Sequence, residues 1–233
     1  MIDRTLNYGR DVLKRFLLAN GGFETALDIG AGRGYDLATV REVNPNARLF
    51  AIEFYPASVQ ELKEKQITVR SLDIERQPFS FEPGSMDVVM ANQILEHTKE
   101  IFWIFDQVSR VLKEGGHFFI GVPNLAALHN RILLALGRQP SPLKNNSAHV
   151  RGFTKPDVEQ LFQSAFPGGY QLVGFGGSNF YPFPPVLARP LARLFPSMAW
   201  GVFFDFKKVK PYRREFLDYP RRMQLETNFY LGE

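Results

Sequence analysis

The sequence predicts a doubly wound α/β fold, in which helices cover both faces of a mostly parallel sheet. Short apolar runs alternate with segments of helical periodicity from residue 26 to residue 122. A turn with three glycines, Gly30, Gly32 and Gly34, follows the first run. Acidic residues, Glu53 and Asp73, follow the next two runs. Ligands of such sheets bind at the carboxyl ends of the strands, so these residues are expected to line one site.

The amino-terminal residues predict an amphipathic helix within residues 1–20. Its apolar side chains recur at helical spacing, and they are Val12, Leu13, Phe16 and Leu17. Gly21 and Gly22 follow and are expected to end the helix. Lys14 and Arg15 interrupt the apolar residues and no small-residue cleavage site follows, so a signal peptide is not expected.

Strands and helices alternate in the next hundred residues. The expected strands are 26–29, 48–52, 67–70, 87–91 and 117–122. The expected helices are 35–43, one opened by Pro56, and 99–112. Proline is favoured in the first turn of a helix, and Gly115 and Gly116 end the last of these helices. Strands separated by helices imply parallel pairing with right-handed crossovers.

The remaining part of the chain adds two helices and two strands. A helix at 125–136 and a polar loop are expected first, and Thr154 with Asp157 forms a capping box for a second helix. A strand at 170–175 precedes an apolar insertion, 176–197, with five prolines and no acidic residue. The last strand is therefore delayed to 200–206. The basic tail that follows is expected to be a solvated surface extension.

The glycine turn distinguishes between two nucleotide-binding patterns. The dinucleotide fingerprint G-x-G-x-x-G would place its third glycine at position 35, where this chain has Tyr35. The pattern present is D-x-G-x-G-x-G, from Asp28 to Gly34. It resembles motif I of the class I S-adenosylmethionine-dependent methyltransferases, which have a seven-stranded sheet. The resemblance implies that the loop wraps the methionine part of the cofactor, with Asp28 near its charged end.

Further motifs extend this resemblance from about Leu6 to Phe206. Glu53 lies where a carboxylate meets the ribose hydroxyls, and the resemblance places Asp73 at the adenine amino group with Ile74 packed against the ring. The segment ANQILEH, residues 91–97, resembles the end of the fourth strand of small-molecule methyltransferases. The expected cofactor-binding residues are Asp28, Gly30, Gly32, Gly34, Glu53, Phe54, Asp73, Ile74, Asn92 and Gln93.

Four residues are candidates for the acceptor side of the site. His97 is a candidate general base, or a helix-start histidine that bonds a backbone group. His149 and Arg151 lie in a stretch that resembles the acceptor border of relatives, where they bind or deprotonate the acceptor, or tie a long loop to the domain. Tyr8 either contacts the substrate or packs. The histidines lack metal-ligand spacing, so no metal ligand is expected.

The resemblance divides the chain into three parts. Residues 1–22 form a helix over the cofactor site, residues 23–177 form the S-adenosylmethionine-binding core, and residues 178–233 hold the apolar insertion, the last strand and the tail. The insertion can be interpreted in two ways. It either packs against protein, as a cover over the acceptor pocket or a homodimer contact, or it makes a peripheral membrane contact. Prolines and arginines interrupt its apolar runs before a bilayer-spanning length is reached.

Composition limits the function further. The chain of 233 residues has no cysteine, which excludes disulfides, cysteine-nucleophile methylation and iron–sulfur radical chemistry. The net charge of +4 and the lack of a basic stripe with interleaved aromatics argue against a nucleic-acid partner. The expected function is S-adenosylmethionine-dependent methylation of an oxygen or nitrogen of a small-molecule, sugar or lipid-linked acceptor, with S-adenosylhomocysteine as product. A cofactor-binding regulator and a nicotinamide oxidoreductase are the alternatives, and the expected location is the cytoplasm or the inner membrane face.

Overall fold

The computed structural model describes residues 2–226 and 228–232, which form one seven-stranded sheet in the order β3-β2-β1-β4-β5-β7-β6. Strand β7 is antiparallel to both of its neighbours, and the other neighbouring pairs are parallel. The strands are β1 (Thr25–Ile29), β2 (Arg48–Ile52), β3 (Thr68–Arg70), β4 (Met86–Asn92), β5 (Leu112–Pro123), β6 (Tyr170–Ser178) and β7 (Gly201–Lys208). The doubly wound, mostly parallel sheet of seven strands is confirmed.

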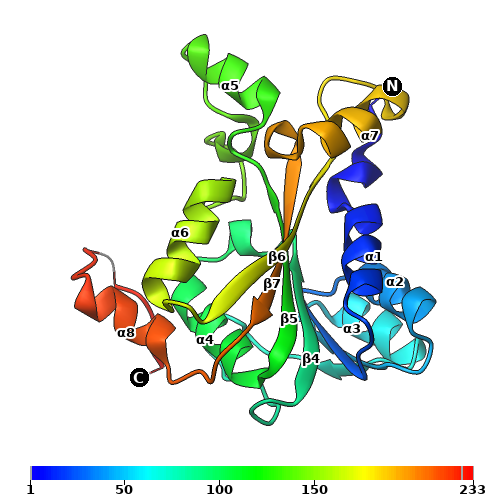
Figure 1. The fold of residues 1–233 in the computed structure, drawn as a ribbon, viewed down its shortest axis with the longest axis vertical. Coiled ribbons are helices and arrows are strands. Elements are labelled where there is room, and N and C mark those ends of the chain that lie inside the picture. The colour runs from blue at the N-terminus through cyan, green and yellow to red at the C-terminus, as the bar shows by residue number, and fades with distance from the viewer. Residues whose placement is uncertain (1, 227, 233) are drawn as a thin grey trace.

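Helices cover both faces of the sheet (Figure 1). One face carries α1 (Arg10–Ala19), α2 (Tyr35–Val43) and α3 (Pro56–Glu64). The other face carries α4 (Ile101–Val111), α6 (Lys155–Ala165) and α8 (Glu215–Arg222). Beyond the carboxyl ends of β5 and β6 stand α5 (Leu128–Ala135) and α7 (Pro185–Leu194). The short 3-10 helices are η1 (Arg4–Tyr8), η2 (Leu95–His97), η3 (Ser141–Leu143) and η4 (Pro196–Met198).

Most element boundaries lie within a few residues of those expected, and two elements begin three or more residues away from the expected start. Strand β5 begins at Leu112 rather than His117, because Leu112 pairs with Met86 before a bulge shifts the register. Helix α5 begins at Leu128, since the Asn124 side chain accepts a hydrogen bond from the Ala126 N–H at 3.0 Å and holds a turn there. The glycine pair at 115–116 is thus part of the bulged strand rather than a stop before it.

The tail is not the solvated extension that its charge suggested. Its helix α8 packs against α4 and α6, and Phe216 is fully buried. The ring of Phe216 lies 5.4 Å from that of Phe105 and 5.6 Å from that of Phe162, measured between centroids. The Tyr212 hydroxyl donates a hydrogen bond to Asp106 at 2.9 Å. The apolar face of a short amphipathic helix therefore outweighs the basic composition of the segment.

The apolar insertion folds into α7 and η4 before the last strand. Its buried side chains form a small cluster of their own, which consists of Phe180, Ala188, Ala192 and Ala199. Leu128 of α5 packs against this cluster, so α5 and α7 lie together at one end of the molecule (Figure 1). Among the described residues, no helix combines the length and the apolar character needed to cross a bilayer.

Candidate active site

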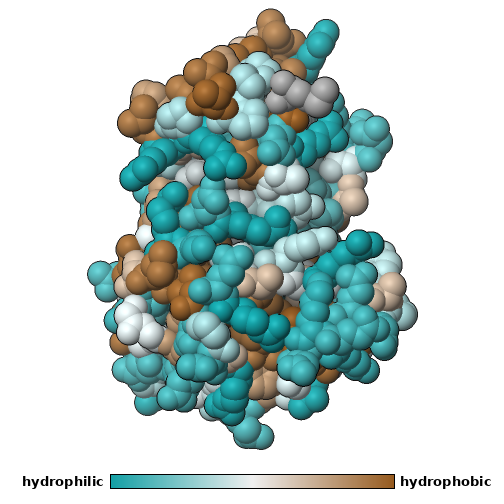
Figure 2. All heavy atoms as spheres, turned by 90° about the vertical axis from the view of Figure 1, so that its right-hand side faces the viewer, coloured by the Kyte–Doolittle hydropathy of each residue, from teal (hydrophilic) through white to brown (hydrophobic). Residues whose placement is uncertain are grey.

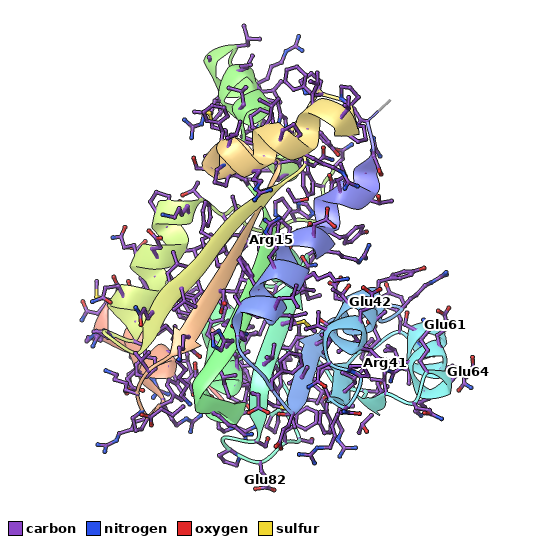
Figure 3. All side chains as sticks on the ribbon, turned by 45° about the vertical axis from the view of Figure 1, so that its right-hand side comes forward. Arg15, Arg41, Glu42, Glu61, Glu64 and Glu82 are labelled. Atoms are coloured by element: carbon purple, nitrogen blue, oxygen red, sulfur yellow. The ribbon has the colours of Figure 1, made fainter. Side chains whose placement is uncertain are left out.

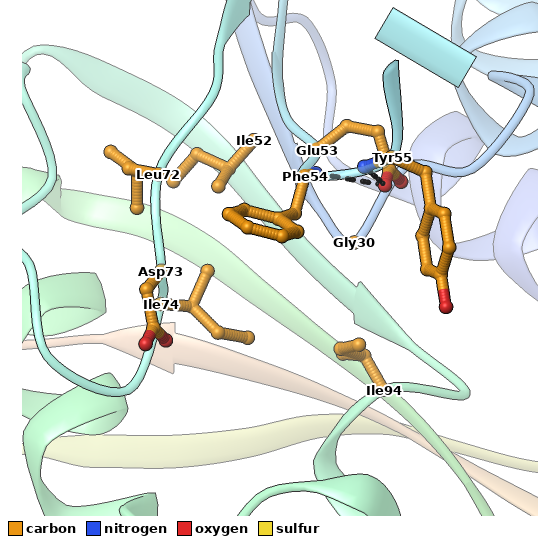
Figure 4. A pocket seen from close by; sticks show the side chains of 9 residues that line it. All are labelled: Gly30, Ile52, Glu53, Phe54, Tyr55, Leu72, Asp73, Ile74 and Ile94. Atoms are coloured by element: carbon orange, nitrogen blue, oxygen red, sulfur yellow. Dashed lines mark hydrogen bonds between the residues drawn. The ribbon is translucent and has the colours of Figure 1, made fainter. Parts of the chain in front are cut away.

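A cavity of about 460 Å³ opens at the carboxyl ends of β1 and β2 (Figure 4). Its volume lies in the range of small-molecule sites. The lining residues come from the glycine turn, the ends of β2 and β3, and the segment after β4, and they are Gly30, Ile52, Glu53, Phe54, Tyr55, Leu72, Asp73, Ile74 and Ile94. The structure therefore brings five of the predicted cofactor-binding residues into one wall: Gly30, Glu53, Phe54, Asp73 and Ile74.

The glycine turn can adopt its shape only with glycine at its first positions. Gly30 has φ +71°, and a Cβ there would lie 2.8 Å from the Ile94 side chain. Gly32 has φ +50°, and a Cβ there would meet no atom within 4 Å, so its face is open to a ligand. Both backbones occupy the left-handed region that favours glycine. The turn ends at Gly34, where α2 begins.

Glu53 joins the end of β2 to the glycine turn. One carboxylate oxygen accepts a hydrogen bond from the Gly32 N–H at 2.7 Å. The other accepts bonds from the Phe54 and Tyr55 N–H groups at 2.8 Å each, which Figure 4 draws as dashed lines. A carboxylate has about four acceptor positions. Three are occupied, so the carboxylate is held in place and retains capacity for a ligand hydroxyl.

The rest of the cavity is an apolar slot with a polar end. Ile52, Leu72, Ile74 and Ile94 provide its walls, and Phe54 is 68% exposed at its edge. Asp73 lies beside Ile74 in this wall, and its carboxylate accepts a hydrogen bond from the Glu75 N–H at 2.9 Å. A flat heteroaromatic ring with an exocyclic donor fits this combination of apolar walls and one carboxylate.

Negative charge is concentrated behind the glycine turn. Asp28 is 3% exposed, and burial, together with the nearby carboxylates of Asp36 and Glu53, raises its pKa well above the ordinary value. Asp36 accepts hydrogen bonds from Arg10 at 2.9 Å and from the Asn92 amide at 2.7 Å. Because carboxylates outnumber the one arginine here, the cluster suits a cationic ligand group.

Asn92 also positions the amino-terminal segment. Its amide donates a hydrogen bond to the Tyr8 carbonyl at 2.9 Å, so η1 is tied to the end of β4. The Tyr8 side chain is 45% exposed and stacks under the Arg10 guanidinium, 4.8 Å from the ring centroid. It does not line the cavity described above. Asp36 and Arg10 were not among the predicted site residues, because an acidic or basic residue in the first turn of a helix belongs to no recognisable motif.

Gln93 has a strained backbone next to this cluster. Its φ is +56°, and its N–H donates a hydrogen bond to the Gly121 carbonyl at 2.7 Å. Its side-chain Nε2 is buried and has no hydrogen-bond partner among the described residues. A strained residue with an unpaired buried donor is typical of a functional site.

His97 and His149, predicted separately, lie together. Their rings meet edge to face with centroids 4.7 Å apart. The sequence neighbour of His97, Glu96, is 2% exposed, and its carboxyl oxygen Oε2 has no hydrogen-bond partner in the described residues. Burial raises the pKa of Glu96 to about 8. Burial and the nearby His97 lower the pKa of His149, so its imidazole is neutral at neutral pH.

Arg151 ties a long loop to the domain, which is the second of the two roles predicted for it. Its guanidinium donates hydrogen bonds to the Thr98 carbonyl at 3.0 Å and to the Lys99 carbonyl at 2.7 Å. These contacts fix the loop that carries His149 against the segment after η2. Arg151 therefore positions His149, and its predicted contact with the acceptor remains a prediction.

A second cavity of about 260 Å³ adjoins His149. Side chains from η1, α5, the segment between α5 and α6, the insertion and the residue before β7 line it, namely Arg4, Asn7, His129, Ser141, Pro142, His149, Tyr181 and Trp200. The segment from Ile94 to His97 runs between this cavity and the first one, because Ile94 lines the first and His97 contacts His149. Two neighbouring cavities with a histidine pair between them suit a two-substrate reaction.

The sheet order, the glycine turn and the Glu53 cavity together define a class I S-adenosylmethionine-dependent methyltransferase. A family model described as a methyltransferase domain matches residues 23–166, and the chain belongs to that family. The cofactor is S-adenosylmethionine. The open face of Gly32 allows the cofactor to approach the backbone closely. The Glu53 carboxylate fits its ribose, and the buried carboxylates behind the turn fit its cationic end.

Relatives at lower similarity agree with this assignment. The chain is 26% identical over 141 residues to a probable S-adenosylmethionine-dependent methyltransferase of Mycolicibacterium smegmatis, covering 60% of this chain and 50% of the relative. An arsenite methyltransferase of Halobacterium salinarum is 29% identical over 105 residues, which is 42% of this chain and 26% of the relative. The matches span half or less of the length of these curated relatives.

Solved structures share the fold. A methyltransferase of Thermotoga maritima, described as a possible histamine N-methyltransferase, superposes with a TM-score of 0.60 at 13% identity, covering 88% of this chain and 92% of that chain. The 1,6-didemethyltoxoflavin-N1-methyltransferase of Burkholderia thailandensis, solved with S-adenosylhomocysteine, gives 0.59 at 17% identity, covering 86% and 78%. At such identities the likeness concerns the fold alone.

Proposed function

We propose that this protein transfers the methyl group of S-adenosylmethionine to an oxygen or nitrogen of a small acceptor bound beside His149. The observation that carries the proposal is the pair of neighbouring cavities, one anchored by Glu53 and the other lined by His149. When bound, S-adenosylmethionine supplies a methyl group on a positively charged sulfur. The chain contributes mainly the position of the acceptor relative to that methyl, which accounts for much of the acceleration of such reactions.

Each part of the site has a role in this proposal. Glu53 and Asp73 bind the ribose and the adenine, and Asp28 with Asp36 faces the cationic end of the cofactor. His149 is neutral at neutral pH, so it accepts the proton of an acceptor hydroxyl. Arg151 holds the loop that carries His149, and Arg4 and Asn7 of η1 form part of the wall of the acceptor cavity.

A lipid-linked acceptor is the finer form of this proposal. Exposed apolar side chains gather on α5 and α7, at the end of the molecule where the acceptor cavity lies (Figure 2). They are Ile132, Leu134, Leu136, Val186, Leu187, Leu194 and Phe195. A groove of about 370 Å³ beside α7 is lined by Arg15, Arg189 and Arg193, with Arg15 reaching from α1 (Figure 3). Asp11 also lines the groove and pairs with Arg189 at 3.3 Å, so arginines outnumber acids there three to one among the described lining residues. Apolar surface next to a basic groove suits an acyl or prenyl chain that carries a phosphate.

Incubation with methyl-labelled S-adenosylmethionine and cell extract tests the proposed function. We expect label in the lipid-extractable fraction, and none from a Glu53→Ala variant that has lost cofactor binding. Label confined to the small aqueous fraction would contradict the lipid-linked acceptor while confirming the transferase. A protein that binds S-adenosylhomocysteine in a calorimeter but labels no fraction, even with extracts of several organisms, would instead be the regulator.

Cofactor affinity is expected to rise with pH. Burial and the carboxylates of Asp36 and Glu53 raise the pKa of Asp28 well above its ordinary value, Arg10 opposes them, and only the ionised form attracts a cationic ligand group. Affinity for S-adenosylhomocysteine therefore increases as pH rises through the raised pKa of Asp28. Without ligand, the folded protein keeps the Asp28 proton at pH values above about 3.9, the pKa of an aspartic acid in the unfolded chain. The free energy of unfolding therefore falls as pH rises from about 3.9 to the raised pKa of Asp28.

Calorimetric titrations across pH, with the wild type and Asp28→Asn, measure this dependence. The variant is expected to bind more weakly at alkaline pH and to lose the pH dependence. Equal pH dependence in the two proteins would show that another group is responsible.

A further inference from the structure

Glu96, His97 and His149 form a cluster whose chemistry goes beyond a simple base. One potential metal-ligating atom of each residue lies within 4.8 Å of those of the other two. The cluster combines two adjacent residues of η2 with one from a loop more than fifty positions further along the chain. We propose that these three side chains bind a divalent transition-metal cation at the acceptor side of the active site.

Two unpaired buried atoms point to a missing ligand. The Oε2 atom of Glu96, on a side chain of a residue 2% exposed, and the Nδ1 atom of His149 both lack hydrogen-bond partners among the described residues. Buried polar atoms are rarely left unpaired, because they lose their hydrogen bonds to water without a replacement. Both belong to the same cluster, so one cation would satisfy them together.

The remaining ring nitrogens are already oriented for ligation. The Nδ1 atom of His97 lies 3.4 Å from the Ala148 carbonyl, which leaves its Nε2 free for a metal. Metal-binding histidines typically donate their second N–H to a backbone carbonyl in this way. The Nδ1 atom of His149 is buried and has no hydrogen-bond partner among the described residues, so this nitrogen is available to the same cation.

The ligand set indicates the class of cation. Two imidazoles and one carboxylate suit Zn²⁺, Mn²⁺, Fe²⁺ or Co²⁺ better than Mg²⁺ or Ca²⁺, which prefer oxygen ligands. Three protein ligands leave coordination positions open. His149 lines the cavity where an acceptor hydroxyl would bind, so a cation held by this cluster would be next to that hydroxyl. The expectation of no metal ligands came from sequence spacing, which does not show that a distant loop brings His149 to His97.

The role of the cation rests on the proposed methyl transfer, although its binding does not. A bound cation would make a coordinated acceptor hydroxyl more acidic, so that hydroxyl would lose its proton to water while the cation held its oxygen in position. His149 would then be a metal ligand rather than the base, because the metal-bound acceptor hydroxyl would release its proton to water.

Titration of the chelator-treated full chain with Co²⁺, followed by visible absorption, tests the site. We expect saturation at one equivalent, and at least a roughly tenfold loss of affinity in Glu96→Gln and His149→Ala. His129→Gln is the matched control, because His129 lies in the same cavity but outside the cluster and should leave the affinity unchanged. S-adenosylhomocysteine binding by each variant verifies that it is folded.

The outcomes separate this inference from the proposed function. Absence of Co²⁺ and Zn²⁺ binding, or equal affinity in wild type and Glu96→Gln, would overturn the metal site. Methyl transfer that survives chelation would then leave the transferase proposal standing with His149 as base. Tight cluster-dependent metal binding in a protein that methylates nothing would keep the site and overturn the function.

Discussion

Replacement of Glu53 by alanine is expected to weaken S-adenosylhomocysteine binding by about 100-fold or more. The carboxylate fixes Gly32 at 2.7 Å and the Phe54 and Tyr55 N–H groups at 2.8 Å, and it faces the cavity. Hydrogen bonds to a charged group contribute about 1.5–3 kcal/mol each. Loss of the one further bond that the carboxylate can make to the ribose, together with the Gly32 bond that shapes the glycine turn, corresponds to roughly 3 kcal/mol or more, which is at least 100-fold in Kd.

Isothermal titration calorimetry with S-adenosylhomocysteine measures this effect, and Glu42→Ala provides the matched control. Glu42 lies on α2 near the surface, where it pairs with Lys14 at 2.9 Å and has no contact with the cavity (Figure 3). Its replacement removes the same charge and should change the Kd less than threefold. A Glu53→Ala protein that binds as tightly as Glu42→Ala would show that the ligand does not bind at the end of β2.

Local motifs predicted five of the nine residues that line the cavity beside Glu53. A glycine turn, and an acid after each of the next two strands, occur at fixed short distances from a strand end, and the topology of a parallel sheet brings these ends together. Glu53, Asp73 and Ile74 therefore line the same cavity as Gly30, as predicted. Helix α2 and strand β2 also have the predicted bounds, because strong apolar runs and glycine or proline mark both ends.

Long-range contacts account for what the sequence did not reveal. His97 and His149 were recognised individually, but their ring contact depends on how Arg151 ties the later loop to Thr98. Glu96 is part of the ILEH segment, but only the structure shows that its Oε2 atom is buried and has no hydrogen-bond partner among the described residues. Partners that are distant in sequence carry no periodicity or spacing, so their pairing appears only in three dimensions.

Phe216→Ala in the tail is expected to destabilise the fold by about 3–5 kcal/mol, the usual cost of deleting a buried phenylalanine ring. Phe216 is fully buried, and its ring centroid lies within 6.1 Å of those of Phe105, Phe162 and Phe166. For a protein of this size each kcal/mol lowers Tm by about 2–4 °C, so a drop of roughly 10 °C is expected.

Thermal unfolding of the wild type, Phe216→Ala and Met223→Ala measures this contribution. Met223 follows α8 and is 53% exposed, so its replacement should change stability by less than about 0.5 kcal/mol. If the tail were a solvated extension, as its charge suggests, both replacements would lower the stability by equally small amounts. A large loss for Phe216 alone would instead mean that the core needs the segment after β7, because α8 covers the surface of α4 and α6 that the sheet leaves exposed.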